Sequence, residues 1–198
     1  MQLAVDNLAC RRAGRRVFDG LSFTLRPGEA LAVTGRNGAG KSTLIAAIAG
    51  FVPRHAGEIR ATGIGERSLS ECLHLVGHRD GLKASLTAEE NLAFAASILG
   101  GPRLGTDEAL ARVGLPGAAH LPVAFLSAGQ RRRVALARLL VAQRPLWLLD
   151  EPLTALDAAG QGLLAGIMAE HLGGGGLILA ATHAPLPIEG AREFRLGA

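Results

Sequence analysis

A glycine-rich loop carrying one lysine is the segment of this 198-residue chain whose residue types best suit chemistry. The spacing fits G-x-x-x-x-G-K-S/T, in which backbone N–H groups surround nucleotide phosphates and the lysine reaches the β- and γ-phosphates. Lysine is scarce here, because arginine makes up nearly all of the 21 Lys and Arg residues. The motif therefore predicts that a nucleoside triphosphate is bound. Its residues are Gly35, Arg36, Asn37, Gly38, Ala39, Gly40, Lys41, Ser42 and Thr43.

The segments on either side of this loop suit the same chemistry. Leu31 to Thr34 is a short apolar run typical of a buried strand, and Leu44 to Ala49 predicts a helix. A strand, a glycine loop and a helix N-terminus place the positive end of the helix dipole against the phosphates. Glycine supplies 27 residues of the chain, so a chance match is the alternative. The flanking pattern argues against it.

Two adjacent carboxylates follow another apolar run. Leu146 to Leu149 predicts a buried strand, and Asp150 and Glu151 come directly after it. The C-terminal ends of parallel strands face the ligand crevice, so Asp150 is placed to hold Mg²⁺ together with the Ser42 hydroxyl. Glu151 is then the residue that orients or deprotonates the attacking water. Taken alone, the pair would more often be polar caps after a strand, but together with the phosphate loop it indicates a catalytic site.

A third motif stands immediately before a predicted amphipathic helix, Arg131 to Ala142. A hydroxyl, a flexible glycine and a helix N-terminus together suit a second anion-binding surface. The alternative is an ordinary serine N-cap. The residues of this motif are Leu126, Ser127, Ala128, Gly129 and Gln130.

With these three motifs in this order, the chain resembles the ATP-binding cassette family over nearly its whole length. Ala128 is the one change from the family signature LSGGQ. The resemblance implies that ATP and Mg²⁺ are bound and that Glu151, Lys41 and His183 take part in catalysis, with His183 contacting the γ-phosphate. It also implies that Thr154 to Asp157 is the loop that crosses a dimer interface.

The order of the elements predicts an α/β P-loop NTPase of the cassette type. Alternating strands and helices indicate a mostly parallel sheet core, and the apolar alternation that begins at Leu3 indicates an N-terminal antiparallel β portion. We expect a single ATP-binding domain over residues 1–198. Its core would comprise about 1–85 and 122–198.

Residues 86–121 predict a small helical subdomain. Thr87 and Glu90 have the spacing of a capping box at the start of its first helix. Gly100, Gly101 and Pro102 predict the end of that helix. A second short helix is expected from Asp107 to Val113.

Two positions depart from the family pattern. The family usually has a glutamine after the strand that corresponds to Leu73 to Val76, but Arg79 stands there. Arginine cannot coordinate Mg²⁺, so Arg79 would contact phosphate or carboxylate, or His78 or Asp80 would substitute. The family also stacks an aromatic ring on adenine near the first strand. This chain has no Tyr, so guanidinium groups after Cys10 would stack there, or adenine would bind more weakly.

A subgroup resemblance is carried by the short length, the loop Gly77 to Lys83, the segment Leu86 to Leu92 and the variant signature. Together they are similar to the haem-exporter ATPases of bacterial cytochrome c maturation. The resemblance implies a peripheral subunit on the cytoplasmic face of the bacterial inner membrane. It would work with integral membrane permease subunits and a second cassette copy, in an ATP-dependent homodimer that drives haem export or release.

Composition leaves two rival functions open. The formal charge is +4, and arginines gather at 11–16 and 131–133, which suits either an anionic partner or solvated faces. A cassette ATPase acting on nucleic acid is one rival. Such proteins usually carry two cassettes or coiled-coil insertions, which this sequence lacks, so no nucleic acid is expected. The other rival is the cassette of a different small-molecule or lipid exporter.

Two further features bear on location. The only cysteines, Cys10 and Cys72, are too few for a disulfide framework or a zinc site, which suits a reducing cytosol. The chain is 48% hydrophobic, and its mean hydropathy of +0.27 is high for a free enzyme. Either the excess fills the core or part of the surface is buried against another subunit.

Overall fold

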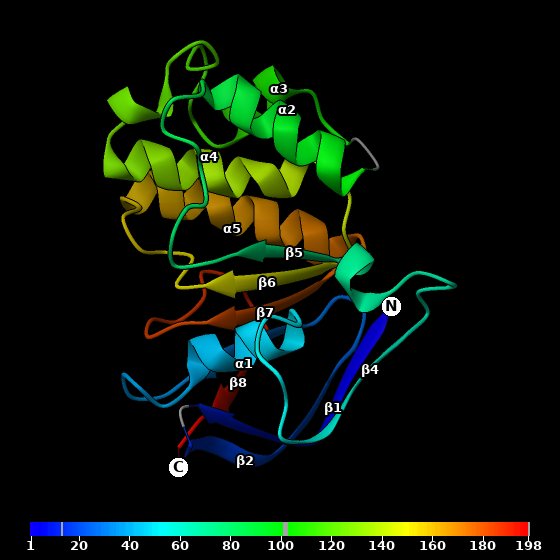
Figure 1. The fold of residues 1–198 in the computed structure, drawn as a ribbon. Coiled ribbons are helices and arrows are strands. Elements are labelled where there is room, and N and C mark those ends of the chain that lie inside the picture. Colours follow the sequence, from blue (N-terminus) through cyan, green and yellow to red (C-terminus); the bar gives the residue numbers. More distant parts are fainter. Residues whose placement is uncertain (13, 101–102, 198) are drawn as a thin grey trace.

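The computed structural model describes residues 1–12, 14–100 and 103–197, which form two sheets and a set of covering helices (Figure 1). The predicted α/β cassette architecture is confirmed, and the predicted strands and helices occur with boundaries shifted by a few residues at most. The strands are β1 (Gln2–Arg12), β2 (Arg15–Leu25), β3 (Ala30–Thr34), β4 (Ala56–Thr62), β5 (Leu73–Val76), β6 (Leu146–Asp150), β7 (Leu177–Ala181) and β8 (Arg192–Arg195). The helices are α1 (Lys41–Ile48), α2 (Ala88–Leu99), α3 (Thr106–Arg112), α4 (Ala128–Val141) and α5 (Ala158–Gly173), with the 3₁₀ turns η1 (Leu69–Cys72) and η2 (Val123–Phe125).

The core is a parallel sheet with the strand order β5-β6-β7-β3-β8. Every residue of β6 and β7 is buried, as expected for parallel strands covered on both faces. Alternate residues of β6 face different layers: Trp147 and Leu149 belong to the apolar cluster of α4 and α5, whereas Leu146 and Leu148 belong to the cluster of α1. The carboxyl ends of β3, β6 and β7 therefore reach one edge of the sheet between two well-packed layers.

The second sheet is antiparallel, with the order β2-β1-β4. Its buried residues Leu3, Val5 and Phe18 share a cluster with Leu44 and Ile45 of α1, so this sheet closes over the helix that follows the phosphate loop (Figure 1). The sheet thus fixes α1 from the side opposite the core strands.

The segment between β5 and α4 forms the helical lobe, which we define as residues 86–121. Its two ends are held together, since Ala88 N–H donates to the Leu121 carbonyl at 3.0 Å and Val123 N–H donates to that of Leu86 at 2.9 Å. The capping box of Thr87 and Glu90 is present, as predicted. Helices α2 and α3 pack on α4 and lie beyond it from the sheet in Figure 1.

Two further points concern α2 and the helices as a set. Helix α2 ends at Leu99, with Gly100 as its cap at φ +67°. Gly101 and Pro102, which the sequence also predicted to end it, lie outside the described residues. Within the described part of the chain, no helix is both long enough and apolar enough to cross a bilayer.

Candidate nucleotide site

The phosphate loop joins β3 to α1. Helix α1 starts at Lys41, and its N-cap Gly40 supplies no side-chain hydrogen bond, which leaves the first N–H groups of the helix to an anion. Glycine is required at two points. A Cβ on Gly35 (φ +142°) would lie 2.6 Å from the Leu196 carbonyl oxygen, and one on Gly40 (φ +104°) would lie 2.6 Å from a Val17 methyl. The backbone thus approaches its neighbours too closely for any other residue.

Lys41 is folded over this loop. The residue is only 7% exposed, and its ammonium donates to the carbonyl oxygens of Gly35 at 2.9 Å and Arg36 at 3.5 Å. The charge therefore lies within the curve of the loop, where the motif places phosphate oxygens.

Ser42 and Asp150 meet across α1 and β6. The Ser42 hydroxyl donates to a carboxylate oxygen of Asp150 at 3.0 Å, and Asp150 is 8% exposed at the end of its strand. A hydroxyl beside a carboxylate is a fitting donor set for Mg²⁺, which prefers oxygen ligands. No group of three or more His, Cys, Asp or Glu suited to a metal occurs in the described ranges. A magnesium ion here would need phosphate and water oxygens to complete its shell.

Glu151 and His183 form the second pair. The His183 ring nitrogen Nδ1 lies 2.6 Å from a carboxylate oxygen of Glu151. An ionised carboxylate only accepts hydrogen bonds, so Nδ1 carries the shared proton and Nε2 takes no part in this contact. Glu151 itself has φ +50°, a left-handed conformation that is strained for a residue with a side chain. The end of β6 is therefore shaped to present this carboxylate.

The motif Leu126 to Gln130, which we call the signature turn, caps α4. This helix begins three residues earlier than predicted. The Ser127 hydroxyl accepts from Gln130 N–H at 3.2 Å, and the Gln130 amide oxygen accepts from Ser127 N–H at 2.8 Å. Within one chain, Ser127 thus acts as the N-cap of α4, which was the alternative prediction for this residue. Gly129 lies close to Ala155, because a Cβ there would lie 3.0 Å from the Ala155 carbonyl oxygen, which is closer than ordinary van der Waals contact.

Within one chain the signature turn and the phosphate loop face different cavities. Gly35, Arg36 and His183 line a cavity of about 660 Å³, and Ser127 and Gln130 line another of about 500 Å³. The two linings have no residue in common. The structure thus gathers Lys41, Ser42, Asp150, Glu151 and His183 at one edge of the sheet and leaves the signature turn apart from them.

The segment Thr154 to Asp157 lies beside the signature turn, because Ala155 and Asp157 line the same cavity as Ser127. Asp157 caps α5 by accepting from Gly160 N–H at 2.9 Å and pairs with Arg133 at 2.5 Å. The hydrogen bond from Gly160, and then the one from Arg133, lower the pKa of the Asp157 carboxyl. This loop is therefore anchored at its end while Ala155 stays on the surface.

Arg132 is a residue that sequence reasoning missed, because it was counted only within a charged cluster. It is 3% exposed and donates to the backbone carbonyls of Asp150 and Glu151. The helical spacing could have indicated that Arg132 is buried, since Leu136 and Leu139, four and seven residues later, are buried on the same helix face. Of the residues near the usual glutamine position, His78 and Arg79 are exposed and Asp80 pairs with Arg132.

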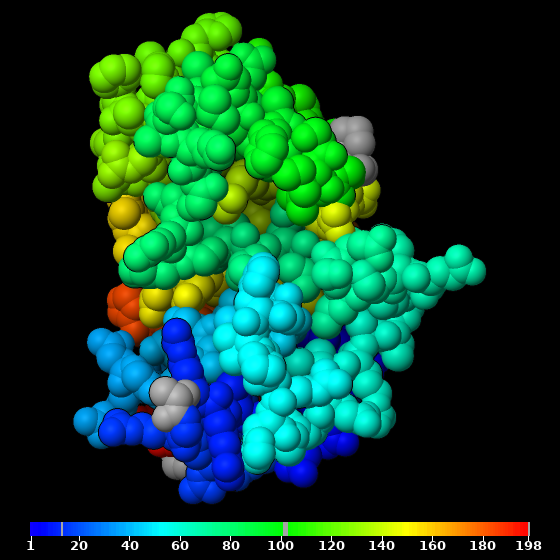
Figure 2. Space-filling model, in the orientation of Figure 1, coloured from blue at the N-terminus to red at the C-terminus, as the bar shows by residue number. Residues whose placement is uncertain are grey.

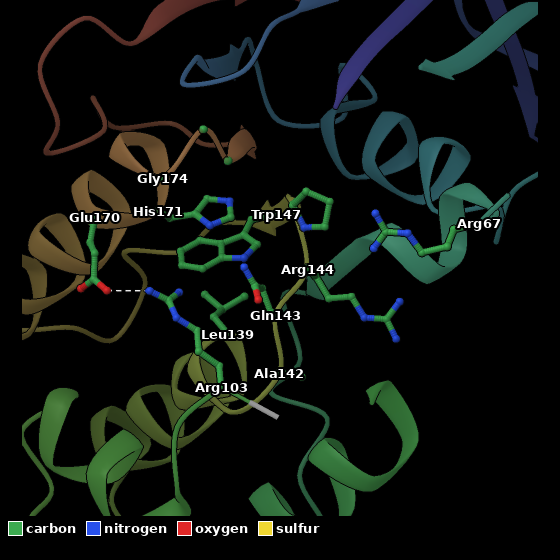
Figure 3. A pocket seen from close by; sticks show the side chains of 13 residues that line it. Arg67, Arg103, Leu139, Ala142, Gln143, Arg144, Trp147, Glu170, His171 and Gly174 are labelled. Carbon is green, nitrogen blue, oxygen red and sulfur yellow. Dashed lines mark hydrogen bonds and ion pairs between the residues drawn. The ribbon is translucent and has the colours of Figure 1, made fainter. Parts of the chain in front are cut away.

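A further cavity, of about 510 Å³, lies at the opposite ends of the strands, next to the residues that precede β6 and β7 (Figure 3). The Trp147 and His171 rings stack there at 3.7 Å between centroids. Burial lowers the pKa of His171 to about 4, so the ring is neutral. Arg103 pairs with Glu170, and Arg144 donates to backbone carbonyls. These charged groups of the cavity are thus engaged within the chain, whereas the Trp147 indole nitrogen is a buried donor without a partner among the described residues.

Comparisons with known proteins agree with this geometry. The model of the ABC transporter family matches residues 18–154. The cytochrome c biogenesis ATP-binding export protein CcmA of Bradyrhizobium diazoefficiens is 55% identical over 198 residues, covering 100% of this chain and 98% of that protein. The protein of the same name from Nitrobacter winogradskyi is 53% identical with the same coverage.

Solved structures share the fold. A putative ABC transporter ATP-binding protein from Pyrococcus furiosus has a TM-score of 0.86 at 22% identity, covering 99% of this chain and 98% of that one. An ATP-binding cassette described as a dimer in a post-hydrolysis state with ADP and Pi has a TM-score of 0.77 at 23% identity, covering 92% and 88%. This chain belongs to the ABC transporter family of ATP-binding cassettes, in the group of the cytochrome c biogenesis ATP-binding export proteins.

Proposed function

We propose that this chain is the ATP-hydrolysing subunit of a transporter complex that powers haem export or release in bacterial cytochrome c maturation. The observation that carries the proposal is the end-to-end identity of 55% with an export protein of cytochrome c biogenesis. The catalytic pairs at the sheet edge supply the chemistry that such a protein needs.

ATP is the substrate, and the chain's own residues divide the work. Lys41 and the N-terminus of α1 stabilise the negative charge of the transferring phosphoryl group. Glu151 orients the attacking water and accepts its proton, and His183 holds the Glu151 carboxylate through Nδ1. Ser42 and Asp150 would hold Mg²⁺, which when bound neutralises charge on the phosphates.

A second copy of the chain completes the site. Because the signature turn faces its own cavity, nucleotide would lie between residues 35–43 of one chain and Ser127, Ala128, Gly129 and Gln130 of the other. In a head-to-tail pair with two-fold symmetry, this arrangement creates two equal sites. ATP binding closes the pair and hydrolysis opens it.

Integral membrane permease subunits are the remaining partners, on the cytoplasmic face of the bacterial inner membrane. Large apolar side chains of α2 support contact with another subunit, since Phe94 is 57% and Ile98 is 64% exposed. Figure 2 shows this green helix at the surface of the helical lobe, with the cyan segment that follows α1 below it. Within a single cassette of residues 1–198, the lobe would pass the closing motion to the membrane.

The rival functions are less well supported. Arg132 is buried and Arg133 pairs with Asp157, so the cluster at 131–133 is not an exposed basic surface for nucleic acid. A different exporter would share every feature of the site, and only the similarity to cytochrome c biogenesis proteins separates it.

The test uses two inactive variants of the full chain. Lys41→Ala removes the ammonium of each phosphate loop, and Ser127→Arg blocks each signature turn, so neither variant alone forms an intact composite site. Mixing them one to one should restore roughly a quarter of the wild-type ATPase rate, because half of the dimers then contain one intact site. A mixture that stays inactive would contradict the composite site.

The control carries both substitutions in one chain. Adding the Lys41→Ala/Ser127→Arg chain to either single variant assembles no intact site and should restore nothing. Haem release into the periplasmic side of membrane vesicles that contain the complex, with ATP supplied on the other side, tests the transported species. ATP hydrolysis without haem movement would favour the rival exporter.

A further inference from the structure

A buried arginine of α4 joins the end of β6 to the loop after β5. The Arg132 side chain is 4% exposed. Its Nη2 donates to the carbonyl oxygens of Asp150 at 3.0 Å and Glu151 at 2.7 Å. Its Nη1 donates to the Gly77 carbonyl oxygen at 2.8 Å and pairs with an Asp80 carboxylate oxygen at 3.3 Å. Because the guanidinium is a planar fork, these four acceptors fix its plane and position.

Arg132 contacts the backbone of Glu151, and the conformation of that backbone sets the direction of the proposed catalytic carboxylate. Glu151 is left-handed at φ +50°, and such strain persists only when the surroundings fix it. Its N–H donates to the Ala181 carbonyl at 2.8 Å, and its carbonyl accepts from Arg132 at 2.7 Å and from Thr154 N–H at 3.2 Å. Without Arg132, only the longer of the two bonds to this carbonyl remains, so the peptide after Glu151 and the direction of the carboxylate are less firmly fixed.

The same arginine touches the segment that connects the core to the helical lobe. Asn91 of α2 binds the Lys83 backbone in both directions, at 2.8 and 3.1 Å, and donates to the Thr87 carbonyl at 2.8 Å. Residues 83–87 are therefore fastened to the lobe. At the end of the lobe towards β5, movement against the sheet therefore has to be absorbed between Gly77 and Lys83, the segment that Arg132 contacts.

The connection between Arg132 and the loop after β5 includes an ion pair. Among the described residues, Asp80 forms the one ion pair of Arg132, and the Nε atom of Arg132 is a buried donor without a partner. A buried cation that loses its counter-charge is strongly disfavoured. When Asp80 moves with its loop, the guanidinium is drawn with it and away from the Asp150 and Glu151 carbonyls.

We propose that Arg132 is a positioning residue for Glu151, and that its pair with Asp80 makes hydrolysis depend on the position of the helical lobe. The inference rests on the proposed function, because it needs Glu151 to be the catalytic carboxylate. Arg132 touches neither substrate nor reacting atoms and acts through the backbone of Glu151.

The decisive readout is a split between kcat and nucleotide binding. In the full chain purified with its membrane partners, Arg132→Met should lower kcat roughly 10- to 100-fold while changing nucleotide affinity about twofold or less. Arg132→Lys should recover part of kcat, because an ammonium can reach one or two of the four acceptors. An arginine that only stabilises the fold would shift the unfolding temperature and leave kcat of the folded fraction unchanged.

Asp80→Asn tests the link to the lobe. It keeps the shape of the side chain and the bonds of Arg132 to carbonyls but removes the counter-charge. The expected result is a smaller loss of basal hydrolysis than in Arg132→Met, together with loss of most of the stimulation that the membrane partners give to the full chain. Stimulation equal to that of the wild type would refute the link.

Arg138→Met is the matched control. Arg138 also belongs to α4, donates to the Gly81 carbonyl at 3.5 Å, and does not contact Asp150 or Glu151. We expect it to keep kcat. Equal losses in Arg132→Met and Arg138→Met, or a normal kcat in Arg132→Met, would overturn the proposal. If Arg132→Met does not fold, the kcat of Arg132→Lys and the stimulation of Asp80→Asn decide it. Failure of the wild type to hydrolyse ATP would refute the proposed function instead.

Discussion

The Glu151 carboxylate and the His183 ring, 32 positions apart in the chain, are joined at 2.6 Å because β6 and β7 are neighbours in the parallel sheet. Because an ionised carboxylate only accepts hydrogen bonds, this contact requires the proton on Nδ1 of His183. Two residues that are ordinary in isolation are thus brought together by strand order, and we propose that they act as a catalytic pair. The first prediction concerns that carboxylate.

Replacing Glu151 by glutamine should abolish turnover while ATP binding persists. The amide keeps the size of the side chain but cannot accept the proton of water, so we expect kcat to fall roughly 10²- to 10⁴-fold. Closed dimers should accumulate with ATP, and size-exclusion chromatography measures them. Glu170→Gln is the control, because Glu170 pairs with Arg103 and Arg112 far from the site. Steady-state turnover at the normal rate in Glu151→Gln would refute the assignment.

Lys41→Ala should weaken nucleotide binding itself. Loss of the charge-assisted bonds to phosphate corresponds to about 1.5–3 kcal/mol, or roughly a 10- to 150-fold higher Kd, which calorimetric titration with a non-hydrolysable nucleotide measures. The chain offers a matched control in Lys83, an exposed lysine whose backbone, not its side chain, meets Asn91. Equal affinities for Lys41→Ala and Lys83→Ala would rule out the loop as the binding site.

The free energy of unfolding should decrease as the pH is lowered from 6.5 to 4.5. Burial lowers the pKa of both His74 and His171 to about 4, so the unfolded chain binds more protons than the folded one in this range. The favourable contribution is complete above about pH 6.5 and is lost progressively as the pH falls towards 4, by up to about 3 kcal/mol for each ring. Urea unfolding at pH 7.5, 6.0 and 5.0 measures it.

A variant that cannot titrate separates this effect from acid unfolding in general. His171→Phe retains a ring against Trp147 and should remove about half of the pH dependence in this window. The carboxyl groups with lowered pKa, such as Glu29 and Glu170, act below the window, since they start from 4.5. An unchanged slope in His171→Phe would mean that its protonation does not govern acid stability.

Gly57→Ala should destabilise the antiparallel sheet strongly. Gly57 has φ +82°, and a Cβ would lie 2.3 Å from the Asn7 carbonyl oxygen, so backbone strain and a backbone clash add together. Gly65→Ala is the control that isolates backbone strain, because Gly65 has φ +63° but open space around it. We expect a loss of about 1–2 kcal/mol for Gly65→Ala and at least about 3 for Gly57→Ala. Equal losses in chemical unfolding would contradict the close approach.

Elements of the fold could be predicted from the sequence where the local pattern agrees with the tertiary environment. The apolar run from Leu146 to Leu149 predicted a buried strand, and its place in a parallel sheet already implied that Asp150 would meet Ser42. The start of α4 was misplaced because serine, alanine and glycine read as a loop, although Ser127 and Gln130 have the spacing of a capping box. That spacing would have been enough to place the helix start correctly.

Arg132 shows what local pattern gives only in part, since its place on the buried face of α4 indicated burial but not its partners. Its neighbours Arg131 and Arg133 make the segment resemble a solvated charged face, and only the approach of the Gly77 loop and the end of β6 turns the middle arginine inwards. Its four acceptors come from segments more than 15 residues away on either side. The identity of these acceptors depends on three separate segments meeting and could not be read from any one of them.

The separation of the signature turn from the phosphate loop has a consequence for the cell. If each chain contributes half of every site, a subunit made in excess of its membrane partners meets another copy rarely, and the rate of futile ATP consumption falls with the square of its free concentration. Surplus copies would then remain idle without any inhibitor, and the proposed assembly with membrane partners, by holding two copies side by side, would itself activate them.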